Sequence, residues 1–215
     1  MGKIVLATII ISGSAKWLLK VGGNKEKWYG SDRIFMYVMT VFGAMAVNYS
    51  EQCTEYGWVV SNLRLLAGCL LAGGLLSAAY MDRRNCWVYN YVWWWCLPWA
   101  GILGLTAGGG FHGIVAVLVF VMLQQLLFSR MYGKADCHAF SVCALAECGN
   151  AVGIVGVLLQ MFLSVVLLTI VQLFRGNVTP RGRLREPQPF IPYIITAFFS
   201  VTFLESVFRT TYIYA

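Results

Sequence analysis

Two of the three aspartates in the chain, Asp82 and Asp136, lie at the ends of long apolar stretches. The third, Asp32, lies in a polar stretch and is expected to be a solvated loop or cap residue. A carboxylate at the edge of a hydrocarbon layer is costly to bury, so its presence there indicates a functional site. Gly74 and Ala78 precede Asp82 at intervals of four residues, which places all three on one helix face. Stripes of small residues are where membrane helices approach closely, so Asp82 is expected to face protein rather than lipid.

Asp136 begins a second stripe of this kind, formed by Ala139, Phe140, Cys143 and Ala144. Two carboxylates at one depth on facing helices could share a proton, with one group ionised and the other protonated. The ionised group would act as a general base on water, and the protonated group would polarise a scissile carbonyl. The alternative is a pair of helix caps at the membrane interface, paired with Arg83, Arg84 and Lys134. Spacing alone leaves both interpretations open.

The composition excludes a soluble domain. The 215 residues are 59% hydrophobic and 12% charged, with a mean hydropathy of +0.70, whereas soluble domains carry roughly 45–50% apolar and about 25% charged residues. These values predict an all-α, polytopic helical membrane protein. The net charge of +7 does not indicate nucleic-acid binding, because no polar segment combines basic and aromatic residues. Seven cysteines without any C-x-x-C spacing give no support for a metal site.

Eight apolar stretches are expected to form helices. The first has a second interpretation, because Lys3, an apolar run and then Gly13-Ser14-Ala15 also resemble a cleavable signal peptide. Residues 1–57 are expected to form an N-terminal pair of helices, and residues 58–215 a six-helix unit. The tryptophan run 93–95 is expected to face lipid or the interfacial belt. The eight stretches are about Ile4–Leu19, Arg33–Tyr49, Trp58–Met81, Trp87–Thr106, Phe111–Phe128, Asp136–Cys148, Ala151–Phe174 and Phe190–Arg209.

The positions of the basic residues indicate an orientation. Twelve of the sixteen Lys and Arg fall in four predicted loops on one side of the membrane. By the positive-inside rule these loops are cytoplasmic, and so are the helix ends that carry Asp82 and Asp136. The loops are 20–33, 82–86, 129–135 and 175–189, and they hold Lys20, Lys25, Lys27, Arg33, Arg83, Arg84, Arg130, Lys134, Arg175, Arg181, Arg183 and Arg185.

Both aspartates lie in short motifs that occur in a fixed order. The first motif is D-x-R-x-x-x-[IV]-x-N at 82–90, and the second is G-x-[GA]-D at 133–136. The residues at their fixed positions are Asp82, Arg84, Val88 and Asn90, and then Gly133, Ala135 and Asp136. A third segment, Ile191-Pro192-Tyr193, follows near the end of the chain. Over about residues 58–210 this arrangement resembles the type IV prepilin peptidases, the membrane aspartyl proteases of the GxGD type, whose closing segment is I-P-F.

The resemblance implies a six-helix aspartyl peptidase core behind the two N-terminal helices, with Asp82 and Asp136 as the catalytic pair. It implies an aspartic endopeptidase that cleaves the basic leader from type IV prepilin-like precursors at the cytoplasmic face of a prokaryotic cell membrane. No metal or organic cofactor is expected. No N-methyltransferase activity is expected either, because the four-cysteine domain of larger members has no counterpart here. The expected partners are the precursors and membrane lipids, which the cytoplasmic arginines would contact through phospholipid headgroups.

Two positions depart from the family pattern. His138 stands where the family carries a lysine, two residues after the second aspartate. Because histidine titrates near neutral pH, His138 is expected to supply that positive charge beside Asp136 only in part. Ala135 replaces the second glycine of GxGD, a change that the family tolerates.

Two other functions fit the same residues. A proton-coupled transporter could use both aspartates, although transport favours carboxylates near the bilayer midplane beside broken helices. A GxGD-type protease could also act on substrates other than pilins, such as signal-peptide remnants. The motifs do not separate this last function from that of a prepilin peptidase.

Overall fold

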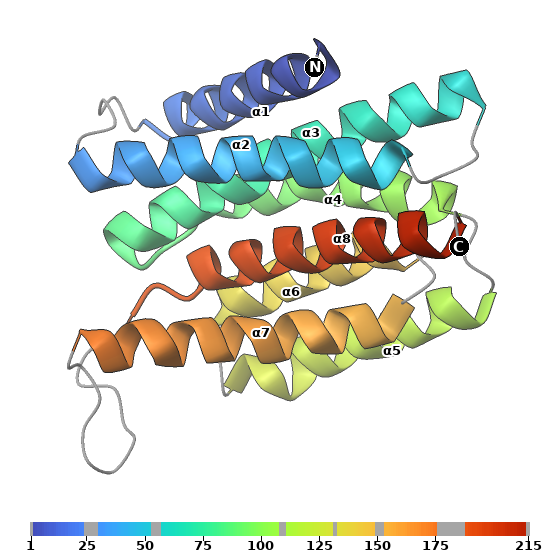
Figure 1. Cartoon of the computed structure of the whole chain (residues 1–215). Helices are drawn as coiled ribbons and strands as arrows, with labels where there is room; N and C mark the ends of the chain where they lie inside the picture. The colour runs from blue at the N-terminus through green and yellow to red at the C-terminus, as the bar shows by residue number, and fades with distance from the viewer. Residues whose placement is uncertain are drawn as a thin grey trace.

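The computed structural model describes residues 2–23, 30–52, 57–107, 111–130, 133–148, 153–175 and 188–213. In this part of the chain every regular element is a helix, and the helices lie side by side in one bundle (Figure 1). α1 lies along one edge of the bundle, and α5 and α7 lie along the opposite edge. The elements are α1 Gly2–Val21, α2 Gly30–Gln52, α3 Trp58–Asn85, α4 Asn90–Thr106, α5 Phe111–Leu126, the 3₁₀ turn η1 Phe128–Arg130, α6 Lys134–Glu147, α7 Gly153–Phe174 and α8 Ile191–Ile213.

Each of the eight predicted apolar stretches forms a helix, which confirms the all-α prediction. Among the described residues, five segments are long and apolar enough to cross a membrane, as expected of a helical membrane protein. α4 and α6 have only 17 and 14 residues, and α2 includes Asp32, Arg33 and Glu51 among its 23 residues. The five membrane-length segments are Gly2–Val21, Trp58–Asn85, Phe111–Arg130, Gly153–Phe174 and Ile191–Phe208.

The predicted loop 82–86 is mostly helical. α3 continues to Asn85, so Asp82 lies inside its C-terminal part and not beyond its end. Cys86 ends the helix in the left-handed conformation, with φ of +49°, and its backbone N–H donates to the Asp82 carbonyl oxygen at 2.8 Å. α4 then begins at Asn90, three residues later than predicted. The helix boundary was misplaced because the charged residues after Met81 were interpreted as a loop.

The backbone of Cys86 provides a test of this helix end. A residue with a Cβ is less stable by roughly 1–2 kcal/mol in the left-handed conformation, and glycine avoids this cost. Cys86→Gly is therefore expected to stabilise the protein by about 1 kcal/mol, which raises Tm in detergent by roughly 2–4 °C. Cys86→Ala keeps the Cβ and is the matched control, with no rise expected. An equal rise in both variants would show that loss of the thiol, and not relief of the backbone, is responsible.

α3 lies at the centre of the bundle, where it packs against α1, α2, α4 and α8. A Cβ on Gly74 would come within 2.5 Å of the Cys96 sulfur in α4, so only glycine permits this close approach. Ala78 is fully buried, and the Asp82 side chain is 6% exposed. The stripe of small residues therefore faces protein, as the sequence predicted.

The N-terminal helices share the hydrophobic core of the others. α1 packs against α2 and α3, and α2 packs against α3 and α8. A Cβ on Gly73 of α3 would overlap the Ser14 side chain of α1, so these two helices are in close contact. Ala15 is fully buried. The segment that resembles a signal-peptide cleavage site thus lies within α1, at its contact with the bundle.

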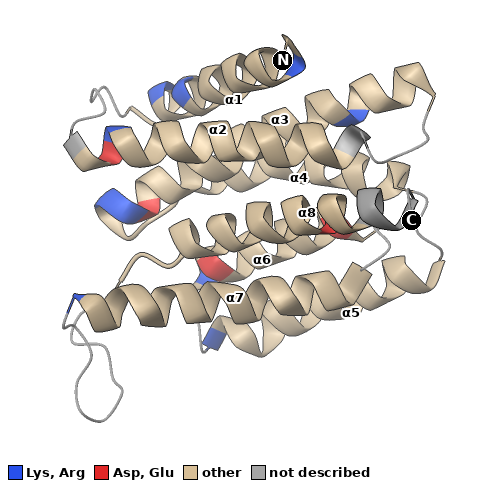
Figure 2. Ribbon diagram, in the orientation of Figure 1, with Lys and Arg blue, Asp and Glu red and all other residues tan. Residues whose placement is uncertain are grey.

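Although Lys3 and Arg64 lie in the first two turns of α1 and α3, most of the described basic residues gather at one end of the bundle (Figure 2). This end, called the basic end below, contains the C-terminal ends of α1, α3 and α7 and the N-terminal ends of α2, α4, α6 and α8. It carries Lys20, Arg33, Arg83, Arg84, Arg130, Lys134 and Arg175. The other basic residues of the four predicted loops, Lys25, Lys27, Arg181, Arg183 and Arg185, lie outside the described residues.

Candidate active site

Asp82 is bound to the start of the last helix. Its Oδ2 accepts a hydrogen bond from the backbone N–H of Ile191 at 3.0 Å. Ile191 is the first residue of α8, so the carboxylate occupies a position where the helix leaves its N–H groups without helical partners. Pro192 follows in the first turn of α8, where proline is tolerated because its missing N–H has no helical partner. The structure thus brings the third predicted segment onto the first aspartate.

Asp136 is the third residue of α6 and is bound to the residue before that helix. Its Oδ2 accepts a hydrogen bond from the Gly133 N–H at 3.2 Å. A Cβ on Gly133 would lie 3.2 Å from the same oxygen. Gly133 has an ordinary φ of −65°, so the close approach of the carboxyl group, and not the backbone conformation, favours glycine here. Each aspartate therefore caps the N-terminus of a helix. Asp136 caps its own helix, α6, and Asp82 caps α8.

The two carboxyl groups share one cavity of about 630 Å³. α4 and α8 bring them together, because each of these helices packs against both α3 and α6. The carboxylates are close enough for Asp82 to repel an ionised Asp136 electrostatically. This space, called the aspartate cavity below, is lined by Asp82, Cys86, Trp87, Val88, Asn90, Trp93, Gly133, Lys134, Ala135, Asp136, His138, Gln188 and Phe190. Most of the predicted motif residues are thus brought to one place.

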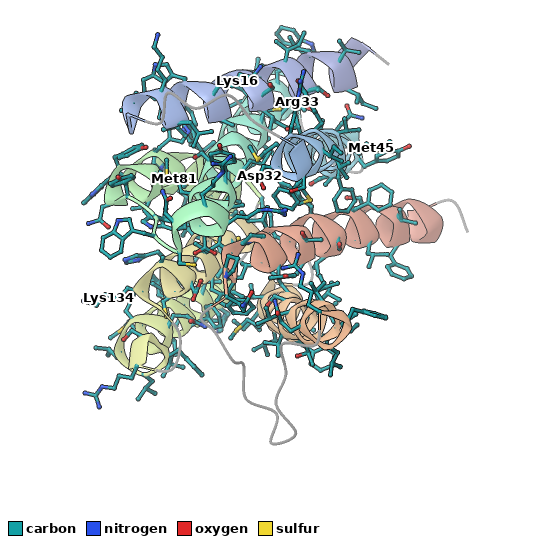
Figure 3. All side chains as sticks on the ribbon, turned by 90° about the vertical axis from the view of Figure 1, so that its left-hand side faces the viewer. Lys16, Asp32, Arg33, Met45, Met81 and Lys134 are labelled. Atoms are coloured by element: carbon teal, nitrogen blue, oxygen red, sulfur yellow. The ribbon has the colours of Figure 1, made fainter. Side chains whose placement is uncertain are left out.

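Arg84 is not among the lining residues. Its Nε lies 2.9 Å from Asp32 Oδ2, and the Nε of Arg83 lies 2.8 Å from Asp32 Oδ1. Asp32 is in the first turn of α2, and Figure 3, which looks onto the basic end, shows it between α2 and the end of α3. Asp32 therefore pairs with both arginines instead of lying in a solvated loop. In the alternative interpretation of the aspartates as interfacial caps, Arg83 and Arg84 pair with Asp82 and Asp136, whereas in the structure both arginines bind Asp32 and so connect α3 to α2.

The link between α3 and α4 supplies residues that the sequence did not single out. The left-handed turn at Cys86 places Cys86 and Trp87 in the cavity wall, beside the predicted Val88 and Asn90. Phe190, directly before the I-P-Y segment, also lines the cavity. Each of these residues lies inside or directly beside a predicted motif in the sequence, and this position could have identified them as candidate site residues.

The prediction that Trp93 faces lipid or the interfacial belt was wrong. It is 5% exposed and lines the cavity, whereas Trp94 is 75% exposed. The indole N–H of Trp95 donates to the Leu70 carbonyl oxygen at 3.2 Å. Consecutive residues on a helix point about 100° apart, so three adjacent tryptophans cannot all face lipid on a helix that is packed on two sides. The expectation of a lipid-facing position holds for Trp94 alone.

His138 lines the cavity but contacts a different element than expected. Its Nδ1 lies 3.4 Å from Gln125 Nε2 of α5, and its ring centroid is 6.0 Å from that of Trp93. Because the amide nitrogen is a donor, Nδ1 is the acceptor, and this arrangement suits a neutral imidazole. Residues two apart on a helix do not face each other, so the side chain lies against α4 and α5 instead of against Asp136.

The described residues contain no group of three or more His, Cys, Asp or Glu side chains placed to hold a metal ion. The titratable groups in the aspartate cavity are the two carboxyls, Cys86, Lys134 and His138. The two carboxyls can take up and release protons, and all five groups can form hydrogen bonds.

No protein-family model, curated protein or solved structure matches the chain. The description of this protein therefore rests on its fold and on the aspartate cavity. The described chain is an all-helical membrane-type bundle in which two carboxylates, from helices joined through α4 and α8, share one cavity at the basic end.

Proposed function

We propose that the chain is a membrane-embedded aspartic endopeptidase that removes the basic leader from type IV prepilin-like precursors at the cytoplasmic face. The observation that carries the proposal is the meeting of Asp82 and Asp136, 54 positions apart in the sequence, in one cavity. The order of their motifs and the nearby Ile191-Pro192 segment support the same function. The cytoplasmic orientation is supported by the positive-inside rule, since most of the described basic residues lie at the end that carries both aspartates.

Peptide cleavage would proceed by general acid–base catalysis. Repulsion between the two carboxylates favours a state in which they hold one proton between them. The ionised aspartate takes a proton from water while the water oxygen bonds to the scissile carbonyl carbon, and the protonated aspartate donates to the carbonyl oxygen. The tetrahedral diol then collapses as the C–N bond breaks: the aspartate that took the proton from water gives it to the leaving nitrogen, and one hydroxyl of the diol returns its proton to the other aspartate. The products are a new carboxyl end and a new amino end.

The cavity wall suits an extended apolar substrate segment. Trp87, Val88, Trp93 and Phe190 supply apolar surface around the two carboxyl groups. The N–H groups of Ile191 and Gly133 each hold one carboxylate oxygen, which orients both carboxyls in the same cavity. A precursor whose own helix lies in the bilayer would present its leader junction at this depth. The basic side chains around the cavity would contact anionic phospholipids.

Transport is the weaker alternative. Transporter sites lie near the midplane at interrupted helices, whereas Asp82 lies near the C-terminal end of α3 and Asp136 in the first turn of α6. Within their described residues both helices are continuous. This placement favours a reaction at the membrane surface.

The proposal is tested by cleavage of a defined precursor. The full chain is reconstituted in liposomes with a prepilin-like precursor that carries a basic leader, a small residue and an apolar helix. Mass spectrometry is expected to find one cut, at the junction of leader and helix. A signal-peptide remnant serves as the second substrate, because cleavage of the remnant alone would assign the enzyme to the non-pilin alternative. Absence of cleavage of both would contradict a peptidase function.

A further inference from the structure

A short series of hydrogen bonds between α5 and α6 ends at the wall of the aspartate cavity. The Ser141 hydroxyl donates to the Cys137 carbonyl oxygen, one turn earlier on α6, at 2.7 Å. Nε2 of Gln125 on α5 lies 3.2 Å from Ser141 Oγ and 3.4 Å from Nδ1 of His138. His138 lines the aspartate cavity, whereas Gln125 and Ser141 do not. The peptidase mechanism above uses none of these side chains.

These contacts determine which atoms carry hydrogens. A serine hydroxyl has one hydrogen, and Ser141 uses it on Cys137, so Ser141 Oγ is an acceptor toward Gln125. The Gln125 atom between Ser141 and His138 is therefore the amide nitrogen, which has two hydrogens. One of them binds Ser141, and the other is available to His138 Nδ1, which is the acceptor. An imidazole that accepts at Nδ1 is neutral and carries its hydrogen on Nε2.

Nε2 is the polar atom that the His138 ring offers to the aspartate cavity. The Nδ1 edge faces Gln125, and the ring lies beside the Trp93 indole, with 6.0 Å between the centroids. No described residue forms a hydrogen bond with Nε2. The buried side-chain atoms without a partner do not include Nε2, so this atom is accessible. The imidazole thus presents an N–H donor in the cavity that holds Asp82 and Asp136.

An extended peptide in the aspartate cavity needs donors for its carbonyl oxygens, because a buried backbone acceptor without a partner is costly. The backbone N–H groups of Ile191 and Gly133 are not available, since each holds a carboxylate oxygen. His138 is two positions after Asp136, which places their Cα atoms about 5 Å apart. An extended strand rises about 3.3 Å per residue, so the carbonyl that His138 reaches is expected within one or two positions of the scissile bond.

We infer that His138 is a substrate-binding residue, whose Nε2–H donates a hydrogen bond to a backbone carbonyl oxygen of the precursor beside the scissile bond. Gln125 and Ser141 are positioning residues, because they fix the tautomer of the imidazole without lining the cavity. Lys134, four positions earlier on α6, supports the neutral form, since like charges at this spacing repel. The inference rests on the proposed peptidase function and names a contact by which that site binds the substrate backbone.

Steady-state cleavage of the precursor in liposomes tests this contact. His138→Phe keeps a flat ring beside Trp93 but has no N–H, and it is expected to raise KM about threefold to tenfold with little change in kcat. His138→Gln restores an amide N–H near the position of Nε2 and should keep KM within about twofold of the wild type. The matched control is His112→Phe, which replaces the exposed histidine of α5 outside the cavity and should leave KM unchanged.

Nitrogen NMR of the full chain with isotope-labelled histidine, in detergent micelles near neutral pH, tests the tautomer without any cleavage. His112→Phe leaves His138 as the one histidine, and its ring is expected to carry hydrogen on Nε2 and none on Nδ1. Gln125→Leu removes the donor to Nδ1 and is expected to populate the Nδ1–H or the doubly protonated form. It should also raise KM, although Gln125 does not line the cavity. A hydrogen on Nδ1 when Gln125 is present would overturn the inference.

The peptidase function and the histidine contact fail on different results. Absence of cleavage by the wild type, with the Nε2–H tautomer present, would contradict the peptidase function and with it the bound substrate carbonyl. Cleavage by His138→Phe with the KM of the wild type would leave the peptidase function intact and overturn only the histidine contact.

Discussion

Replacing Asp82 or Asp136 with asparagine is expected to lower the rate of precursor cleavage by about 10³-fold or more while the protein stays folded. Asparagine has nearly the same shape, and its oxygen can still accept the N–H of Ile191 or Gly133. It cannot accept a proton from water or hold the shared proton. The measurement is single-turnover cleavage in liposomes, with Tm recorded for each variant.

The third aspartate provides the matched control for these variants. Asp32 lies at the same end of the bundle, but it pairs with Arg83 and Arg84 outside the aspartate cavity. Partly exposed ion pairs contribute about 0–1 kcal/mol each, so Asp32→Asn should cleave at the wild-type rate with a small change in Tm. Wild-type cleavage by either Asp82→Asn or Asp136→Asn would show that the pair is structural.

Both aspartates also cap helices, so the loss of a helix cap must be distinguished from the loss of a catalytic carboxyl group. Asp82 holds the first turn of α8, so Asp82→Ala would remove a helix cap and a carboxyl together. Loss of a cap costs about 0.5–2 kcal/mol, and low activity of the alanine variant would have two explanations. The asparagine variant keeps the acceptor and isolates the chemistry. The interpretation of the aspartates as caps and their interpretation as a catalytic pair are thus compatible.

The helices could be predicted because their signal is local. An apolar run long enough to cross a bilayer needs no information from the rest of the chain. Gly133 and Asp136 could be assigned to the same site for a similar reason, because they are three positions apart and contact each other within one helical turn. The end of α3 was placed too early because basic residues are also common in the last turn of helices.

The contacts between distant segments could not be predicted in this way. The bond from Ile191 to Asp82 crosses 109 positions, and the pairing of Arg84 with Asp32 crosses 52. Arg84 belongs to the motif by spacing, yet it binds α2 because the first turn of that helix lies against the end of α3. The burial of Trp93 likewise depends on the position of α6, which no pattern within α4 encodes.

Gly133→Ala is expected to lower cleavage by on the order of tenfold with little change in Tm. The new Cβ would lie 3.2 Å from Asp136 Oδ2, so the carboxyl group must move by a few tenths of an ångström. Misplacement of a catalytic group by about 1 Å can cost about 10²-fold in rate, and a smaller displacement costs correspondingly less. Alanine keeps the backbone N–H and is compatible with the observed φ of −65° and ψ of 150°. The rate and Tm are measured in the same liposome and detergent preparations.

Gly57 is the matched control, because it precedes α3 as Gly133 precedes α6. Its φ of −55° and ψ of 151° are nearly the same, but a Cβ there would have no neighbour within 4 Å. Gly57→Ala should affect the start of its helix as Gly133→Ala does. It should nevertheless leave cleavage unchanged, because the new Cβ would contact no carboxyl group. Equal losses in the two variants would assign the effect to the helix start. A loss confined to Gly133→Ala would tie the rate to the position of the Asp136 carboxyl group.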